Sequence, residues 1–115
     1  MKPLLINIFF DTSEDGKSLI LDVSGHAGQN EYGKDIICSA SSILAFTLAQ
    51  NVSDMQKEKK LRKKPTIVLK DGKATIVCKP LKEHMAEAFN LYITIRKGYM
   101  LLAENYPEYV SLDKV

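Results

Sequence analysis

The segment from residue 66 to residue 78 constrains the fold most, because it carries the clearest β-hairpin pattern in the chain. Two runs rich in Ile, Val and Thr, Thr66–Lys70 and Ala74–Cys78, flank an Asp71-Gly72 step. β-Branched residues favour strands, and Asp-Gly supplies the positive φ that a tight turn needs. The sequence therefore predicts an antiparallel ladder closed by this turn.

A second hairpin is predicted near the N-terminus. Leu4–Phe10 is β-branched and aromatic, and Ser18–Val23 alternates inward apolar residues with polar ones, which is typical of strands. The polar segment Asp11–Lys17 between them contains another Asp-Gly step, which indicates a loop longer than the tightest turn.

Two helices are predicted. Asp35 has the chemistry of an N-cap, and the run that follows it to Val52 leaves little polar face, which indicates a largely buried helix. After Pro80, apolar residues recur at three- and four-residue steps until Pro107, which predicts a long amphipathic helix. Between the helices, Gln56–Lys64 carries six Lys or Arg against one Glu and is predicted to be a solvated connection.

The predicted order is ββαββα with a short tail, and hairpins alternating with helices favour a two-layer α+β sandwich. With 115 residues and 45% hydrophobic content, we expect one domain spanning residues 1–115, small enough to favour an additional oligomer interface. No apolar run is expected to approach the ~20 residues of a membrane span. Two cysteines are too few for a disulfide scaffold and no signal peptide is evident, so we expect a cytoplasmic location.

Cys38 is the residue with the most informative chemical setting. With Asp35 as the N-cap, Cys38 is the third helical residue, so its sulfur lies near unpaired backbone N–H groups and the positive end of the helix dipole. That setting favours the thiolate that attacks carbonyls, and the same N–H groups could stabilise an oxyanion. The alternative is a small buried apolar residue, which is the interpretation that suits Cys78 at the end of a strand.

His26 lies in the loop that leads to the helix of Cys38. Residues 24–34 contain three glycines and no apolar periodicity, a pattern typical of a mobile loop. The eleven residues between His26 and Cys38 allow the ~3 Å approach that a nucleophile and its base require. The combination favours a catalytic dyad, against the alternative of a surface histidine.

Two other interpretations of these residues are weaker. Residues 28–34 match the first seven positions of a phosphate-binding loop, but Asp35 stands where that motif needs Ser or Thr to bind Mg²⁺. A zinc site is disfavoured because no pair of candidate ligands has the short spacing of a structural site. The candidates are Cys38, Cys78, His26 and His84. We therefore expect neither a metal nor an organic cofactor.

The segment around Cys38 also resembles a known family. Gly25-His26-Ala27-Gly28, followed by Tyr32–Cys38 and Ser42, is similar to the signature of the bacterial ribosomal-processing cysteine proteases, in which glycines, His, Asp and Cys recur in fixed order. Outside residues 24–42 the similarity is mainly one of length and element order. Relatives would mostly have Ala and Val after the Cys, whereas residues 39–41 here are Ser-Ala-Ser.

The resemblance implies a homodimeric endopeptidase that removes a short N-terminal extension from a bacterial large-subunit ribosomal protein, next to an aromatic residue. It implies Cys38 as nucleophile, His26 as base and Asp35 as a supporting residue, which either caps the helix or orients His26. Ser42 would support the site from behind. The loop that admits the peptide would be shaped by its glycines, Gly25, Gly28 and Gly33.

A second hypothesis is a non-catalytic ribosome-associated module that holds RNA or a protein tail. It would depend on the cations of residues 57–64, whereas the protease hypothesis depends on Cys38. The formal net charge of +2 is too small to imply nucleic acid by itself. Direct RNA contact is therefore not favoured at this stage, and no membrane partner is expected.

Overall fold

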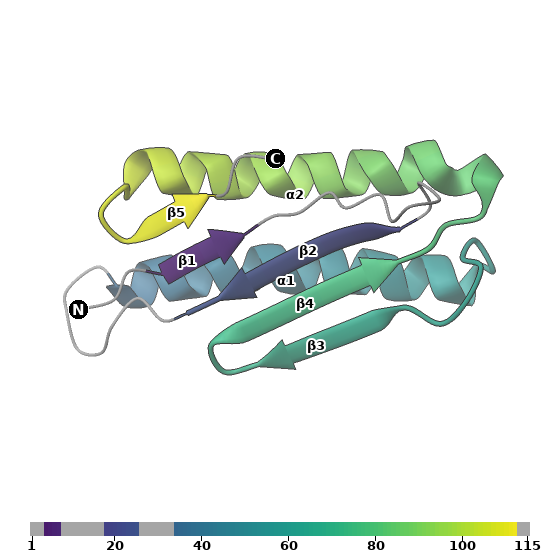
Figure 1. Ribbon diagram of the computed structural model, residues 1–115, viewed down its shortest axis with the longest axis horizontal. Coiled ribbons are helices and arrows are strands. Elements are labelled where there is room, and N and C mark those ends of the chain that lie inside the picture. Colours follow the sequence, from purple (N-terminus) through teal and green to yellow (C-terminus); the bar gives the residue numbers. More distant parts are fainter. Residues whose placement is uncertain (1–3, 8–17, 26–33, 113–115) are drawn as a thin grey trace.

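The computed structural model of the protein describes residues 4–7, 18–25 and 34–112. Its elements follow one another as β1 (Leu4–Asn7), β2 (Leu19–Ser24), α1 (Lys34–Lys57), β3 (Thr66–Lys70), β4 (Lys73–Cys78), the 3₁₀ helix η1 (Lys82–His84), α2 (Met85–Asn105) and β5 (Val110–Leu112). The predicted ββαββα order is confirmed, with η1 and a fifth strand added (Figure 1).

The strands form one sheet in the order β3-β4-β2-β1-β5. β2 pairs antiparallel with β1 and β4, and β3 pairs antiparallel with β4, so both predicted ladders are present. Lys70 lies opposite Lys73 in the second hairpin. Asp71 and Gly72 are therefore the turn, and Gly72 has the predicted positive φ, 77°. The connection between β1 and β2 lies outside the described residues.

Both helices pack on one face of the sheet, which confirms the two-layer α+β sandwich (Figure 1). The inward residues of β2 and β4 lie opposite one another in register and join the helices in a single buried cluster. The apolar stripe predicted for α2 is buried at Ala88, Tyr92, Ile95, Tyr99 and Leu102. Full burial of one large apolar side chain contributes ~1.5–3 kcal/mol, so this shared core fixes where both helices lie.

The bounds of α1 differ from the sequence prediction. The helix begins at Lys34, so Asp35 lies inside it and is not its N-cap, and Cys38 is its fifth residue. The prediction was wrong because an Asp is favourable in the first turn as well as at the cap. At its other end α1 continues to Lys57, because Met55 packs into the core.

The C-terminal region also differs from the prediction. The expected tail contains β5, which pairs parallel with β1 and buries Val110. A strand of three residues is too short to show a period, which explains why the sequence did not reveal it. The last helix starts later than expected, because residues 82–84 form η1 before α2 begins at Met85.

Helix α1 is long and apolar enough, by length and composition alone, to match a membrane span over Ile36–Lys57. This corrects the expectation that no apolar run approaches that length. In the fold, its inward residues pack into the core cluster with the sheet and α2: Ile37, Ala45, Leu48 and Val52. Only 33% of this span is buried, so the prediction of a largely buried helix was wrong: one stripe packs into the core, while apolar residues such as Ile36 and Ile43 remain exposed.

α1 ends in a Schellman motif with a lysine at the position that glycine usually occupies. The N–H of Lys59 donates to the carbonyl of Gln56 at 3.0 Å, and the N–H of Lys60 donates to that of Met55 at 2.9 Å. Lys59 has φ 61° and is the only non-glycine residue with positive φ in the described part of the chain. A side chain with a Cβ is disfavoured in this conformation by about 1 kcal/mol or more.

We therefore expect Lys59→Gly to raise the free energy of unfolding by about 1 kcal/mol, because glycine adopts this φ without a Cβ clash. Urea unfolding of the two proteins at neutral pH measures the difference. Lys59→Ala is the control, since it removes the same charge and retains the Cβ. A gain with alanine equal to that with glycine would show that the charge, and not the backbone, sets the effect.

Candidate active site

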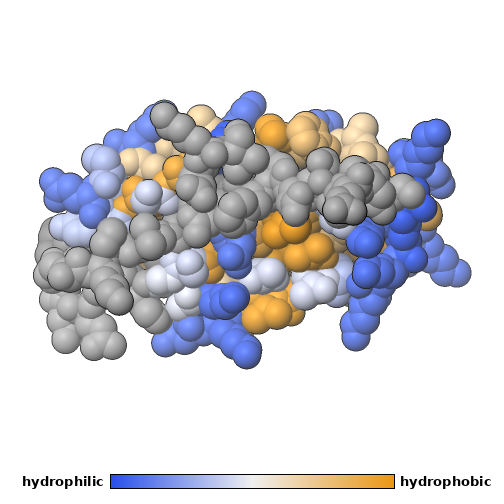
Figure 2. All heavy atoms as spheres, in the orientation of Figure 1, coloured by the Kyte–Doolittle hydropathy of each residue, from blue (hydrophilic) through white to orange (hydrophobic). Residues whose placement is uncertain are grey.

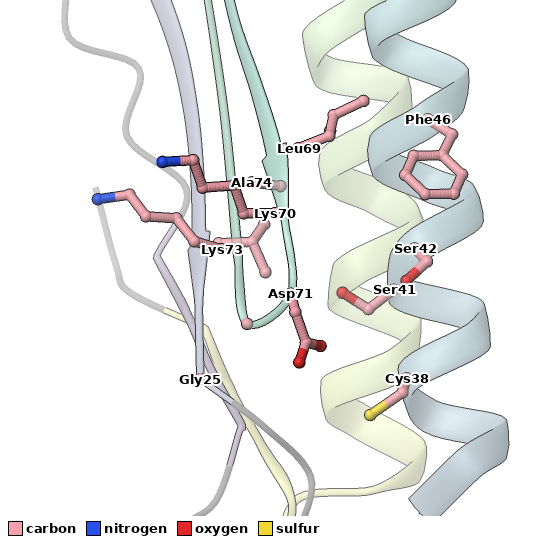
Figure 3. A pocket seen from close by; sticks show the side chains of 12 residues that line it. Gly25, Cys38, Ser41, Ser42, Phe46, Leu69, Lys70, Asp71, Lys73 and Ala74 are labelled. Atoms are coloured by element: carbon pink, nitrogen blue, oxygen red, sulfur yellow. The ribbon is translucent and has the colours of Figure 1, made fainter.

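A cleft of about 570 Å³ opens between the first half of α1 and the β3–β4 hairpin (Figure 3). The end of β2 closes it. Its lining comes from these three elements: Val23, Gly25, Cys38, Ser41, Ser42, Phe46, Leu69, Lys70, Asp71, Gly72, Lys73 and Ala74.

Cys38 lies in this cleft and is partly exposed. Figure 3 shows its sulfur pointing away from α1 towards the space in front of the hairpin turn. The neighbouring Ile37 is fully buried in the core, so the backbone of this turn of α1 is anchored while the thiol remains accessible. Cys38 thus has the accessibility that a nucleophile needs and that a buried structural cysteine lacks.

The helix terminus lies one turn before Cys38, because α1 begins at Lys34. The first four N–H groups of a helix have no partner within it, and side chains lean towards the N-terminal end. Cys38 therefore lies just past the first turn of α1, further inside the helix than predicted, with its side chain leaning towards the terminus. The side chain of Asp35 lies outside what the structure describes.

Two serines follow Cys38 on α1 and differ in burial. Ser42, one helical turn on, is exposed and lines the cleft beside Cys38, and its predicted supporting role stays a prediction. Ser41 is buried, and its carbonyl accepts a hydrogen bond from the Tyr99 hydroxyl of α2 at 2.8 Å. Burial raises the pKa of Tyr99 to about 12, so its hydroxyl remains a donor at neutral pH and ties α1 to α2 beside the cleft.

Gly25 connects the cleft to the predicted base. It follows β2 with φ 107°, and its N–H donates to the carbonyl of Gly72 in the hairpin turn at 2.9 Å. Gly25 lines the cleft and directly precedes His26 in the chain. His26 itself, Gly28 and Gly33 lie outside the described residues, so their predicted roles stay predictions.

The structure adds cleft residues that sequence reasoning missed. The hairpin turn carries Asp71, whose carboxylate points into the cleft on the side of Cys38 (Figure 3). Phe46 on α1 and Leu69 on β3 are 51% and 42% exposed and form an apolar part of the lining. The pairing of β2 with β4 brings the turn to this place, and only knowledge of that pairing could have found these residues.

The remaining candidate ligands do not belong to the site. Cys78 ends β4 with 1% exposure, and burial raises the pKa of its thiol, which confirms its structural role. His84 belongs to η1, an element outside the cleft lining. Within residues 4–7, 18–25 and 34–112, no group of three or more His, Cys, Asp or Glu side chains is placed to hold a metal ion.

Comparison with solved structures shows the same fold in several bacterial proteins. Two crystal structures of an essential ribosomal processing protease, Prp, from Staphylococcus aureus match 98% of this chain and 98% of theirs. One holds a covalently linked product peptide, with 23% identity and a TM-score of 0.65, and the other a substrate peptide, with 22% and 0.62. A Streptococcus mutans protein matches 96% of this chain and 90% of its own, with 24% identity and a TM-score of 0.61.

No curated protein matches this sequence significantly. The family model described as cysteine protease Prp, by contrast, matches residues 5–111, which is nearly the whole chain. That range includes Cys38, Ser42 and the hairpin that completes the cleft. The protein belongs to the Prp family of cysteine proteases.

Proposed function

We propose that the protein is an endopeptidase that removes a short N-terminal extension from a bacterial large-subunit ribosomal protein. The observation that carries this proposal is the accessible Cys38 in a peptide-sized cleft of a cysteine protease fold. The Staphylococcus aureus relatives, described as ribosomal processing proteases and crystallised with peptides, support this class of substrate. Such a substrate is made in the cytoplasm, which is the location we propose.

In the proposed mechanism, Cys38 is the nucleophile and His26 the base. Support for the pair comes from Gly25, which lines the same cleft as Cys38 and is bonded to His26 in the chain. His26 takes the thiol proton, and the sulfur attacks the scissile carbonyl carbon. The proton passes to the leaving amine as the C–N bond breaks, which leaves a thioester on Cys38.

Water then completes the reaction. His26 takes a proton from the water as the water oxygen attacks the thioester carbonyl carbon. The C–S bond then breaks and His26 returns the proton to the sulfur, which releases the carboxylic acid and restores the thiol. The unpaired N–H groups at the start of α1 are the proposed source of stabilisation for the oxyanion in both steps. Ser42, exposed beside Cys38, is a further group that can hydrogen-bond to the bound peptide. For Asp35 we retain a supporting role at the helix start.

The apolar part of the cleft supports cleavage next to an aromatic residue. Phe46 lies two turns after Cys38 on the same helix, and Leu69 faces it from the hairpin (Figure 3). Both side chains are unusually exposed for their size. An aromatic side chain of a peptide would cover them, and aromatic pairs contribute ~0.5–1.5 kcal/mol beyond the area they bury.

Cys38→Ala should reduce cleavage of the extended ribosomal protein by at least about 1,000-fold, because the thioester cannot form. Since Cys38 is only partly buried, the free energy of unfolding should change by less than about 1 kcal/mol. Mass spectrometry of the precursor after incubation measures the product. Cys78→Ala is the matched control, which should lose about 1 kcal/mol of stability and keep its activity. Shortened product from the folded Cys38→Ala protein would exclude this nucleophile.

Phe46→Ala should lower kcat/KM for a peptide with an aromatic residue at the cleavage position by about 10-fold, which corresponds to ~1.4 kcal/mol of lost contact. A peptide with alanine at that position should be affected much less. Phe89→Ala is the control, because Phe89 is a similarly exposed phenylalanine, at 43%, on α2 and away from the cleft. Equal losses for the two peptides would mean that Phe46 does not contact the aromatic residue.

The homodimer expected from the family resemblance is also part of this proposal. An apolar groove of about 390 Å³ runs between α1 and α2, and two of its lining residues, Ile43 and Leu101, are 61% and 60% exposed. Exposed apolar patches of this kind are typical of protein interfaces. We propose that a second copy of the chain covers this groove.

Sedimentation at micromolar concentration should therefore give a dimer, and Leu101→Lys should shift it to monomer, because the substitution places a charge in an apolar interface. Leu69→Lys, a substitution of the same type in the hairpin, should leave the assembly unchanged. A monomeric wild-type protein, or a dimer that tolerates Leu101→Lys, would contradict this arrangement.

A further inference from the structure

Two segments that are distant in sequence meet at the end of the molecule opposite the cleft. We call them together the basic end: residues 57–64, which start at the last residue of α1, and residues 79–82, which follow β4. The N–H of Arg62 donates to the carbonyl of Lys79 at 2.7 Å, and the N–H of Leu81 donates to that of Lys60 at 2.9 Å. The Arg62 side chain also donates to the carbonyl of Pro80 at 3.2 Å. These bonds hold both segments in one fixed arrangement.

The basic end concentrates the positive charge of the chain. It holds eight of the sixteen Lys and Arg residues and one acidic residue, Glu58. The formal net charge of the whole chain is only +2, so the remainder of the chain is net negative. Figure 2 shows hydrophilic side chains gathered at this end of the long axis. The charge is therefore local, which the net charge of the sequence conceals.

Most of these cations are available to a partner. Lys60 is occupied by Glu87 at 3.0 Å and Glu58 at 3.5 Å. No other cation of the basic end forms an ion pair with a residue that the structure describes. Six are exposed: Lys57, Lys59, Arg62, Lys63, Lys64 and Lys82. The basic end thus presents several unpaired charges on a preorganised backbone.

The chemistry of this surface identifies the class of partner. None of the large hydrophobic residues that are exposed in the described part of the chain lies in the basic end. Protein interfaces rely on aromatic or apolar anchors, and stable membrane-surface binding takes an inserted apolar group or lipid chain in addition to a basic cluster. Lysines without such anchors are point charges suited to phosphates, and contacts to phosphates do not depend on base sequence.

We propose that the basic end binds the phosphate backbone of a nucleic acid. We choose structured RNA as this nucleic acid, because the proposed substrate is a ribosomal protein and would bring such RNA near the enzyme. Only the choice of RNA over other nucleic acids rests on the proposed function. Cys38 and Lys57 are nineteen residues apart on α1, which is about 28 Å at 1.5 Å per residue. RNA and peptide can therefore be bound at the same time.

The test is fluorescence anisotropy of a labelled 20-base-pair RNA duplex, titrated with the Cys38→Ala protein over a range of salt concentrations. Lys63→Gln combined with Lys64→Gln should weaken binding about 10-fold and make the slope of log K against log salt shallower by about 2. Lys59→Gly should reduce the slope by about 1 without unfolding the protein. Cleavage of a free peptide by the corresponding variants that retain Cys38 should be unchanged.

Lys70→Gln combined with Lys73→Gln is the matched control. It removes the same charge from exposed residues at the hairpin end of the molecule, and RNA binding should remain near that of the parent. Equal weakening by the two pairs would overturn the site, because total charge alone would then explain binding.

Anionic vesicles or polyglutamate bound as tightly as the duplex would overturn the choice of nucleic acid. Tighter binding of a DNA duplex would overturn the choice of RNA. A protein that does not bind RNA would leave the peptidase proposal intact. A protein that does not cleave the ribosomal precursor would leave the proposal of nucleic-acid binding at the basic end intact.

Discussion

Burial of the inward stripe of α1 is the constraint on which the rest of the structure depends. Ile37 near one end of the helix and Val52 near the other are both completely buried. The same stripe fixes the rotation of the helix, so Cys38, the next residue after Ile37, is directed to the edge of the core. The buried Tyr99 hydroxyl finds its acceptor in the Ser41 carbonyl within this interface, and a buried hydroxyl left without a partner would cost ~1–3 kcal/mol. Core packing and the satisfied Tyr99 hydroxyl thus together determine where the Cys38 thiol lies.

The second wall of the cleft is set by strand register. Ser24 lies opposite Lys73, and Gly25 continues the pairing by donating to Gly72. A slip of one residue would turn every inward side chain of β2 outward, so the core that fixes α1 also fixes the hairpin. The distance between the two walls of the cleft is therefore determined by the packing of the core and not by residues of the cleft itself. The end of β2 is brought to the same place, and with it the point from which the chain continues to His26.

Local chemistry made much of the fold and part of the site predictable. The Asp71-Gly72 turn, the stripe of α2 and the contrast between Cys38 and Cys78 depend on neighbours in sequence, and the structure confirms them. Asp71 and the apolar lining escaped prediction because they reach the cleft only through the β2–β4 pairing. For the same reason the basic stretch was predicted to be a mere connection, since its contact with residues 79–81 is tertiary. His26, Gly28 and Gly33 lie outside the described residues, and their roles rest on sequence alone.

The two ends of α1 have opposite electrostatic character, and each end carries chemistry of matching sign. The N-terminal end of a helix stabilises negative charge by ~0.3–1 kcal/mol, and the C-terminal end stabilises positive charge by a similar amount. Cys38, where negative charge develops in the proposed reaction, lies one turn from the first end, and Lys57 and Lys59 lie at the second. The dipole thereby offsets part of the cost of a lysine at φ 61°. A glycine there would relieve the backbone but remove a cation, so the lysine is understandable if its charge has a use beyond stability.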